Sequence, residues 1–165
     1  MKARFTLGVL LLFMSSRGVA QQGSPPVDQP FHMDSATMAC LDHAIQPRVA
    51  EARRTLPAVL QRFAAGLPPD HFLSVTTKLR DGSGRVEQAF ILVDSVRRDT
   101  VVGRVASEIG FVQGYWRGQR NLVPLAQVMD WTIVRPDGSE EGNYIGKYID
   151  TLQAQLSRGG IPKPC

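Results

Sequence analysis

The spacing of apolar residues changes from a helical to a strand-like period in the middle of the chain. From Pro47 to Ala65 apolar residues recur every three or four positions, as on one face of an α-helix. From Phe72 onward, shorter stretches alternate apolar and polar residues between turns rich in Gly and Asp, which indicates strands. The sequence therefore predicts an α+β domain: a mostly antiparallel sheet of about five strands, packed by an N-terminal long helix and a C-terminal helix.

Caps and turns place the predicted elements along the chain. Asp34 is a candidate N-cap for a short first helix, and Asn143 is one for the terminal helix. Pro57 lies inside the long helix and is expected to bend it or to split it near Arg54. Helices are predicted over residues 35–45, 47–65 and 143–157, and strands over residues 72–80, 85–96, 100–107, 122–128 and 130–135.

The first twenty residues have the three-part pattern of a secretory signal peptide. Lys2 and Arg4 form a basic start, Phe5 to Met14 is an uncharged apolar run, and Gly18-Val19-Ala20 supplies small residues for cleavage after Ala20. The run is about half the roughly twenty residues that a membrane-spanning helix needs, which disfavours the alternatives of an anchor or a buried core helix. We therefore expect a periplasmic or secreted protein with no membrane span after signal removal.

The chain divides into four segments on this basis. Residues 1–20 are the signal peptide, residues 21–33 a flexible linker, residues 34–158 a single α+β domain, and residues 159–165 a C-terminal tail. The full chain has a net charge of +4, but three of its 19 basic residues and none of its 15 acidic residues leave with the signal. The remaining 16 basic and 15 acidic residues give a net charge of +1, so we expect no nucleic-acid partner.

Two cysteines, Cys40 and Cys165, remain after signal removal. In an oxidising compartment an even pair favours a disulfide, here between the first helical region and the C-terminus. Closing so long a loop stabilises the fold by ~4 kcal/mol in the chain-entropy model. The alternative is two unpaired thiols, and the absence of a C-x-x-C motif argues against a redox pair.

No spacing in the chain matches a known catalytic or metal-binding arrangement. His32, His43 and His71 each lie near an aspartate, but none forms the H-x-x-x-H or H-x-H pair that holds a metal. There is no G-x-S-x-G motif, and the Gly-rich turn at residues 81–84 joins two strands instead of opening a helix. We expect no catalytic residue, no bound metal and no cofactor.

Aromatic and basic residues gather in the irregular stretch before the fourth predicted strand. Tyr115, Trp116, Arg117 and Arg120 belong to residue types that are enriched in hot spots of protein interfaces and that also stack on bases or sugars. The alternative is that Trp116 closes one end of the sheet while the two arginines lie in solvent. These four residues are the candidate binding residues.

A second informative segment runs from Asp130 to Tyr148. The segment predicts a strand with Trp131 partly in the core, followed by a Pro-Asp-Gly turn that includes Gly138. The terminal helix is then expected to begin at Gly142-Asn143-Tyr144. Acidic residues are concentrated in this segment. Their usual role in turns explains them better than the alternative, a site that binds a cation weakly. Every residue of the segment thus has a structural explanation.

Short motifs within residues 36–152 are similar to those of a known family. They are Glu51–Pro57, Glu87–Val93, Val102–Val105, Gly118-Gln119, Val128–Trp131, Asp137-Gly138 and Gly142–Tyr144. With them, the chain resembles the YegJ-like family of bacterial domains of unknown function. It departs from that family in lacking a Trp near Ala89-Phe90 and in adding a long N-terminal lead and two cysteines. The resemblance implies no established activity, so no catalytic residue is carried over.

Three classes of function follow from these observations. The favoured one is a non-enzymatic exported module that binds an unknown protein or envelope component through Tyr115 to Arg120. The second is an enzyme, which would need a cleft where Asp130, Arg135, Glu140 and Glu141 converge with shifted pKa values. The third is a toxin-neutralising or inhibitor protein, a class that the small size fits.

Overall fold

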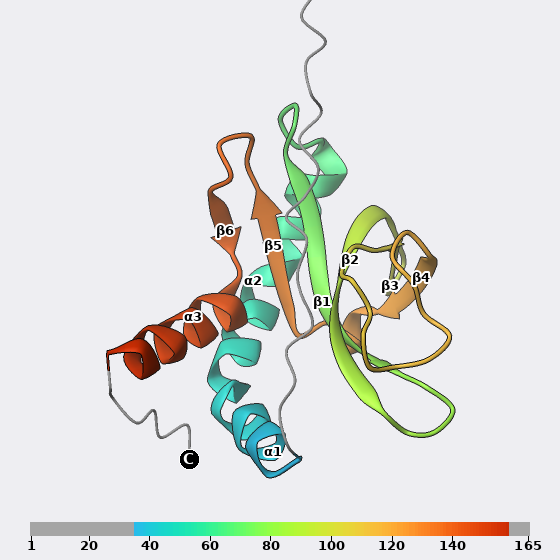
Figure 1. Cartoon of the computed structure of the whole chain (residues 1–165). Helices are drawn as coiled ribbons and strands as arrows, with labels where there is room; N and C mark the ends of the chain where they lie inside the picture. The colour runs from blue at the N-terminus through green and yellow to red at the C-terminus, as the bar shows by residue number, and fades with distance from the viewer. Residues whose placement is uncertain (1–34, 159–165) are drawn as a thin grey trace, which may run out of the picture.

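The computed structural model describes residues 35–158 and shows an α+β fold with three helices and a six-stranded antiparallel sheet (Figure 1). The helices are α1 (Ser35–Ala44), α2 (Gln46–Ala65) and α3 (Tyr144–Ser157), with a short 3₁₀ helix η1 (Leu125–Gln127). The strands are β1 (Phe72–Arg80), β2 (Val86–Arg97), β3 (Thr100–Val105), β4 (Arg120–Pro124), β5 (Asp130–Val134) and β6 (Glu140–Gly142). The predicted fold class is confirmed, with six strands instead of about five.

Several predictions lie outside the described residues. They are the signal peptide, the linker of residues 21–33, the Asp34 cap, His32, the tail of residues 159–165 and Cys165. Cys40 is half-buried in α1, and its pairing with Cys165 stays a prediction.

The long helix α2 begins and ends where the sequence indicates. Pro47 lies in its first turn, and Gly66, at a φ of 99°, ends it by donating its N–H to the carbonyl of Phe63. The predicted split near Arg54 is wrong, because α2 continues through Pro57. The proline is exposed, and buried residues on both sides of it, Leu56 and Val59, hold the two halves of the helix against the same core.

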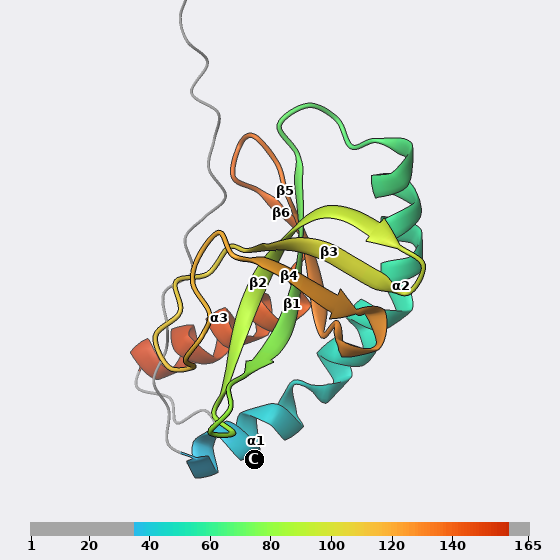
Figure 2. The ribbon, with the colours of Figure 1, turned by 90° about the vertical axis from the view of Figure 1, so that its right-hand side faces the viewer.

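The sheet has the order β4-β3-β2-β1-β5-β6. β1 and β2 form the predicted hairpin, β5 pairs with the other side of β1, and a register shift between Val93 and Ser95 interrupts the pairing of β2 with β3. Figure 2 shows β2, β3 and β4 side by side, with β4 at the sheet edge.

Two strand predictions need correction. The fourth strand covers Arg120–Pro124 and not residues 122–128, because Pro124 has no N–H for a ladder and the chain turns into η1 after it. β6 was not predicted: with three residues, it is too short to show a period of two. It pairs with β5 through the turn in which the Gly138 N–H donates to the carbonyl of Arg135.

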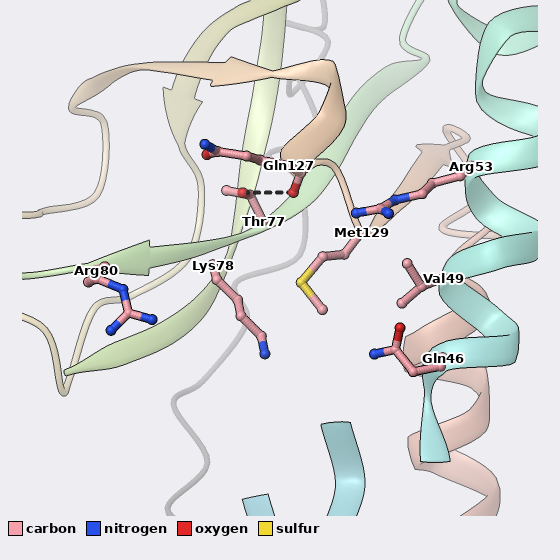
Figure 3. A pocket seen from close by; sticks show the side chains of 8 residues that line it. All are labelled: Gln46, Val49, Arg53, Thr77, Lys78, Arg80, Gln127 and Met129. Carbon is pink, nitrogen blue, oxygen red and sulfur yellow. Dashed lines mark hydrogen bonds between the residues drawn. The ribbon is translucent and has the colours of Figure 1, made fainter. Parts of the chain in front are cut away.

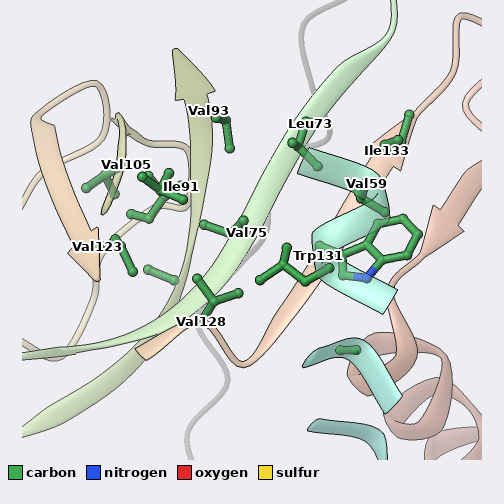
Figure 4. Close-up of a cluster of buried hydrophobic side chains, with 14 of the residues drawn as sticks. Val59, Leu73, Val75, Ile91, Val93, Val105, Val123, Val128, Trp131 and Ile133 are labelled. Carbon is green, nitrogen blue, oxygen red and sulfur yellow. The ribbon is translucent and has the colours of Figure 1, made fainter. Parts of the chain in front are cut away.

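The main core lies between α2 and the sheet face that carries Leu73, Val75, Ile91 and Ile133 (Figure 4). Trp131 is buried at 3 % exposure, more completely than predicted. Its indole N–H donates to the Thr55 hydroxyl of α2 at 2.9 Å, and its ring meets Tyr144 edge-on with centroids 5.9 Å apart. A second cluster joins α2 to α3 through Ile45, Val49, Met129 and Ile145.

We predict that Gly142→Ala destabilises the domain strongly. Gly142 has a φ of +76°, and a Cβ there would collide with the carbonyl oxygen of Trp131 and lie 2.6 Å from its ring. We expect a loss of about 3 kcal/mol or more in the free energy of unfolding, measured by urea denaturation.

Gly138→Ala is the matched control for this prediction. Gly138 has nearly the same φ, +79°, but a Cβ there would meet nothing within 4 Å. Its expected loss is only the backbone strain, about 1 kcal/mol. Equal losses in the two variants would show that the contact with Trp131 has no role.

Candidate functional site

The loop that joins β3 to β4, residues 106–119, carries the most exposed aromatic side chains of the described chain. Trp116 is 62 % exposed and Phe111 is 46 % exposed. We call this segment the aromatic loop. It contains three of the four candidate binding residues, Tyr115, Trp116 and Arg117, and Arg120 follows directly as the first residue of β4.

A carboxylate from β2 holds the first half of the aromatic loop. The two oxygens of Glu87 accept hydrogen bonds from the backbone N–H groups of Gly110, Phe111 and Val112 at 2.8–3.0 Å. Three successive amides that point at one carboxylate fix the loop backbone, because each bond is charge-assisted. The Val112 side chain is buried in the main core and adds an apolar anchor.

A second carboxylate, Asp81 of the β1–β2 turn, holds the middle of the loop. It accepts the N–H of Gln113 at 3.1 Å and also bonds Ser83 and Arg85 within its own turn. These hydrogen bonds, that of the Ser83 hydroxyl first among them, lower the pKa of Asp81 well below its usual range. The sequence identified this stretch as a turn, but nothing in the spacing of residues indicated its bond to a residue 32 positions away.

The two neighbouring aromatics of the loop point to different surroundings. Tyr115 is half-buried, packs against the core, and donates its hydroxyl to the carbonyl of Arg80 at 3.1 Å. Trp116 lies in solvent, while its backbone N–H donates to the side-chain oxygen of Gln119 at 3.1 Å. Tyr115 therefore supports the loop, and Trp116 is the residue that the loop displays.

The two arginines differ as well. Arg117 forms an ion pair with Glu108 of the same loop at 3.2 Å. Arg120 is exposed, lies opposite Arg104 in the strand pairing, and has no acidic partner among residues 35–158. Phe111, which is not among the candidate binding residues, has the guanidinium of Arg85 5.6 Å from its ring centroid.

We predict that Glu87→Gln loosens the aromatic loop while the domain stays folded. A neutral amide has one acceptor oxygen in place of two and loses the charge that strengthens all three bonds. Amide hydrogen exchange at Gly110 to Val112 should become at least tenfold faster. Glu108→Gln is the control, since it removes only an exposed ion pair, and it should leave these rates within about twofold. Equal acceleration in both variants would contradict the assigned role of Glu87.

Asp130, the centre of the family-like motif, is fully buried and caps the terminal helix. One of its oxygens accepts the N–H of Trp131 at 2.8 Å, and the other accepts the N–H of Ile145, in the first turn of α3, at 2.7 Å. Asn143, at a φ of 51°, completes the cap by accepting the N–H of Gly146 at 3.2 Å. The predicted Asn143 cap is confirmed, and Asp130 is a second capping residue that the sequence did not reveal.

Burial raises the pKa of Asp130 to about 6, against the opposing effect of the backbone hydrogen bonds to its charged form. In the unfolded chain the group has its ordinary value of 3.8. Between these values the native state binds more protons than the unfolded state. The stability contributed by the protonated form is therefore complete below about pH 4 and is lost as the pH rises through about 6.

We predict that the free energy of unfolding of the wild type falls by up to about 3 kcal/mol between about pH 4 and pH 7, because a shift of this size corresponds to that energy. Asp130→Asn should be less stable throughout, since its amide NH₂ faces backbone donors, but should lack this slope. Urea denaturation across the pH range measures both. Parallel slopes for the two proteins would contradict the account of Asp130.

The other residues of the enzyme hypothesis do not join Asp130 in a cleft. Glu141 is bonded to Arg62 and Arg135 on the surface, and the Arg62 hydrogen bond lowers its pKa. Glu140 instead accepts from the side-chain amide of Asn143 at 2.6 Å. Neighbouring residues of a strand point to opposite faces, so the two glutamates diverge, while Asp130 lies buried beneath the helix cap.

A groove of about 500 Å³ opens between α2, β1 and η1 (Figure 3). It is lined by Gln46, Val49, Arg53, Thr77, Lys78, Arg80, Gln127 and Met129. All three of its cations are already engaged. Arg53 donates to the carbonyls of Val128 and Ala126, Lys78 pairs with Asp42 at 2.6 Å, and Arg80 donates to the carbonyl of Gly84 at 2.9 Å. The lining includes no carboxylate, histidine or cysteine.

The remaining candidate groups are scattered. His43 is exposed on α1, and His71 has its Nδ1 2.9 Å from the carbonyl oxygen of Pro69. Within residues 35–158 there is no group of three or more His, Cys, Asp or Glu side chains that could hold a metal ion. None of the helices in this part of the chain combines the length and apolar character needed to cross a bilayer.

Comparison with known proteins finds no match to this chain among protein-family models, curated proteins or solved structures. The resemblance to the YegJ-like family therefore stays a prediction, carried by the motifs alone.

Proposed function

We propose that this chain is an exported, non-enzymatic module that binds a protein or envelope component through its aromatic loop. The observation that carries the proposal is the contrast within the loop: its backbone is fixed by Glu87 and Asp81, while Trp116 remains 62 % exposed. A large apolar side chain in water is unfavourable for a domain on its own. It becomes useful when a partner covers it.

The rigidity of the loop supports binding. A flexible loop would lose conformational freedom when a partner orders it, which weakens affinity. Here, hydrogen bonds to the carboxylates of Glu87 and Asp81, and the one that the Tyr115 hydroxyl donates, already fix the backbone around Trp116. Tryptophan and arginine are the residue types that contribute most at protein interfaces, and Arg120 lies free of acidic partners among the described residues beside this loop.

Strand addition is a less suitable mode of binding for this fold. At the β4 edge, the Leu122 N–H donates to the side chain of Asn121 at 2.9 Å, and Pro124 has no N–H. At the other edge, β6 has only three residues. Because neither edge offers a long row of donors, the aromatic loop is the better docking surface.

The predicted signal peptide supports binding outside the cytoplasm. The basic start, the apolar run Phe5 to Met14 and the small residues before Gln21 are what a secretory signal needs. The partner would then be a component of the periplasm, the envelope or the exterior. An inhibitor or toxin-neutralising role is one form that such binding can take.

We predict that Trp116→Ala abolishes capture of the partner. The mature chain, residues 21–165, is immobilised and exposed to envelope extract of the source cells. Loss of a central tryptophan costs about 2 kcal/mol or more in typical interfaces, so captured partner should fall by at least tenfold.

Leu122→Ala is the matched control, because Leu122 is 60 % exposed on β4 but lies outside the loop. It should capture as much partner as the wild type. Equal capture by all three proteins, or no reproducible partner for the wild type, would contradict the proposed function.

A further inference from the structure

The sheet face opposite α2 has an unusual composition for a surface of a two-layer fold. Strand alternation and register place on it Phe90 and Leu92 of β2, Val102 of β3, Thr132 and Val134 of β5, and Ser74 and Thr76 of β1. We call it the outer face. In Figure 1, α2 runs behind β1 and β5, on the side away from this face.

The outer face is largely removed from solvent even though the long helix lies on the other side. Thr76, Val102, Thr132 and Val134 are only 3–9 % exposed. A solvated face of an antiparallel sheet normally carries polar, exposed residues, and one with this apolar content needs a cover. Toward the β4 edge the exposure rises to 60 % at Leu122, so the covered area ends before that strand.

Thr132 places a polar group that needs a hydrogen-bond partner on this apolar surface. Its hydroxyl is buried and has no hydrogen-bond partner among the residues that the structure describes. Buried hydroxyl groups are almost always paired. The cover must therefore bring a polar group, such as a backbone N–H or carbonyl, over β5.

We propose that residues 21–34 form this cover and lie as a strap across the outer face. This segment leads directly into α1, and α1 lies next to β1, because Asp42 in its last turn pairs with Lys78 of β1 at 2.6 Å. Fourteen residues extend over roughly 45 Å. The four strands from β3 to β5 span only about 15 Å between their outermost axes, at about 4.8 Å per strand.

The composition of residues 21–34 fits the outer face. Val27, Phe31 and Met33 supply apolar side chains for the apolar part of the face. Pro25, Pro26 and Pro30 favour an extended chain whose backbone groups stay unpaired, and such groups can bond the Thr132 hydroxyl. The strap replaces the flexible linker expected from composition. It goes beyond the proposed function, because it concerns a different surface from the aromatic loop.

Phe31→Asp in the mature chain tests the strap, with Gln29→Asp as a control that adds the same charge two residues away. In the wild type, the Phe31 ring should show nuclear Overhauser contacts to methyl groups of Leu92 or Val134. Phe31→Asp should shift outer-face methyl resonances, leave core methyls such as Ile91 in place, and raise the fluorescence of an apolar dye severalfold. Gln29→Asp should neither shift the outer-face methyl resonances nor raise the dye fluorescence.

Three results would overturn the proposal. One is the absence of contacts between residues 21–34 and the outer face in the wild type, which needs no variant and holds even if Phe31→Asp fails to fold. Another is a concentration-dependent shift of the outer-face methyls, which would show that a second copy of the chain covers the face. Dye binding by the wild type as strong as by Phe31→Asp would likewise show an open face.

Discussion

The attachment of α3 to the sheet depends on one buried carboxylate. Asp130 ends the chain segment that follows η1, begins β5, and accepts the N–H of Ile145 in the first turn of α3. Without this acceptor a helix N-terminus would be buried with an unpaired donor. The neighbouring Trp131 then packs against Tyr144 and bonds Thr55 of α2, so both helices are fixed from two adjacent residues of one strand. Asp130 and Trp131 are therefore the structural centre of the domain.

A carboxylate that accepts backbone N–H groups also fixes the candidate binding surface. Glu87 accepts the N–H groups of three successive residues of the aromatic loop, as Asp130 accepts the N–H of Ile145 at the start of α3. In both places a side-chain carboxylate accepts backbone N–H groups that have no backbone carbonyl as a partner, because regular secondary structure begins or ends there. The difference lies in what the segment displays: the α3 start is buried, whereas the loop leaves Trp116 in solvent. Asp130 therefore has a structural role, whereas Glu87 holds a loop that displays a candidate binding residue.

Local patterns predict most of this fold, and contacts distant in sequence account for the rest. The bounds of β1 and the end of α2 at Gly66 follow from periodicity and glycine chemistry, which act over a few residues. The continuity of α2 through Pro57 depends on packing that no local pattern encodes. Likewise, Tyr115 and Trp116 look equivalent in the sequence. The Tyr115 bond to Arg80, 35 residues away, is what separates a supporting aromatic from a displayed one.

The central claim is that Trp116 contacts a partner outside the cytoplasm. Site-specific photo-crosslinking in the source cells tests it most directly, with a photoreactive phenylalanine analogue placed at position 116 or, as a control, at the exposed Gln61 of α2. We predict a discrete crosslinked product on the exported chain from position 116 and none from position 61. The absence of a product at position 116, or the same products at both positions, would contradict the account.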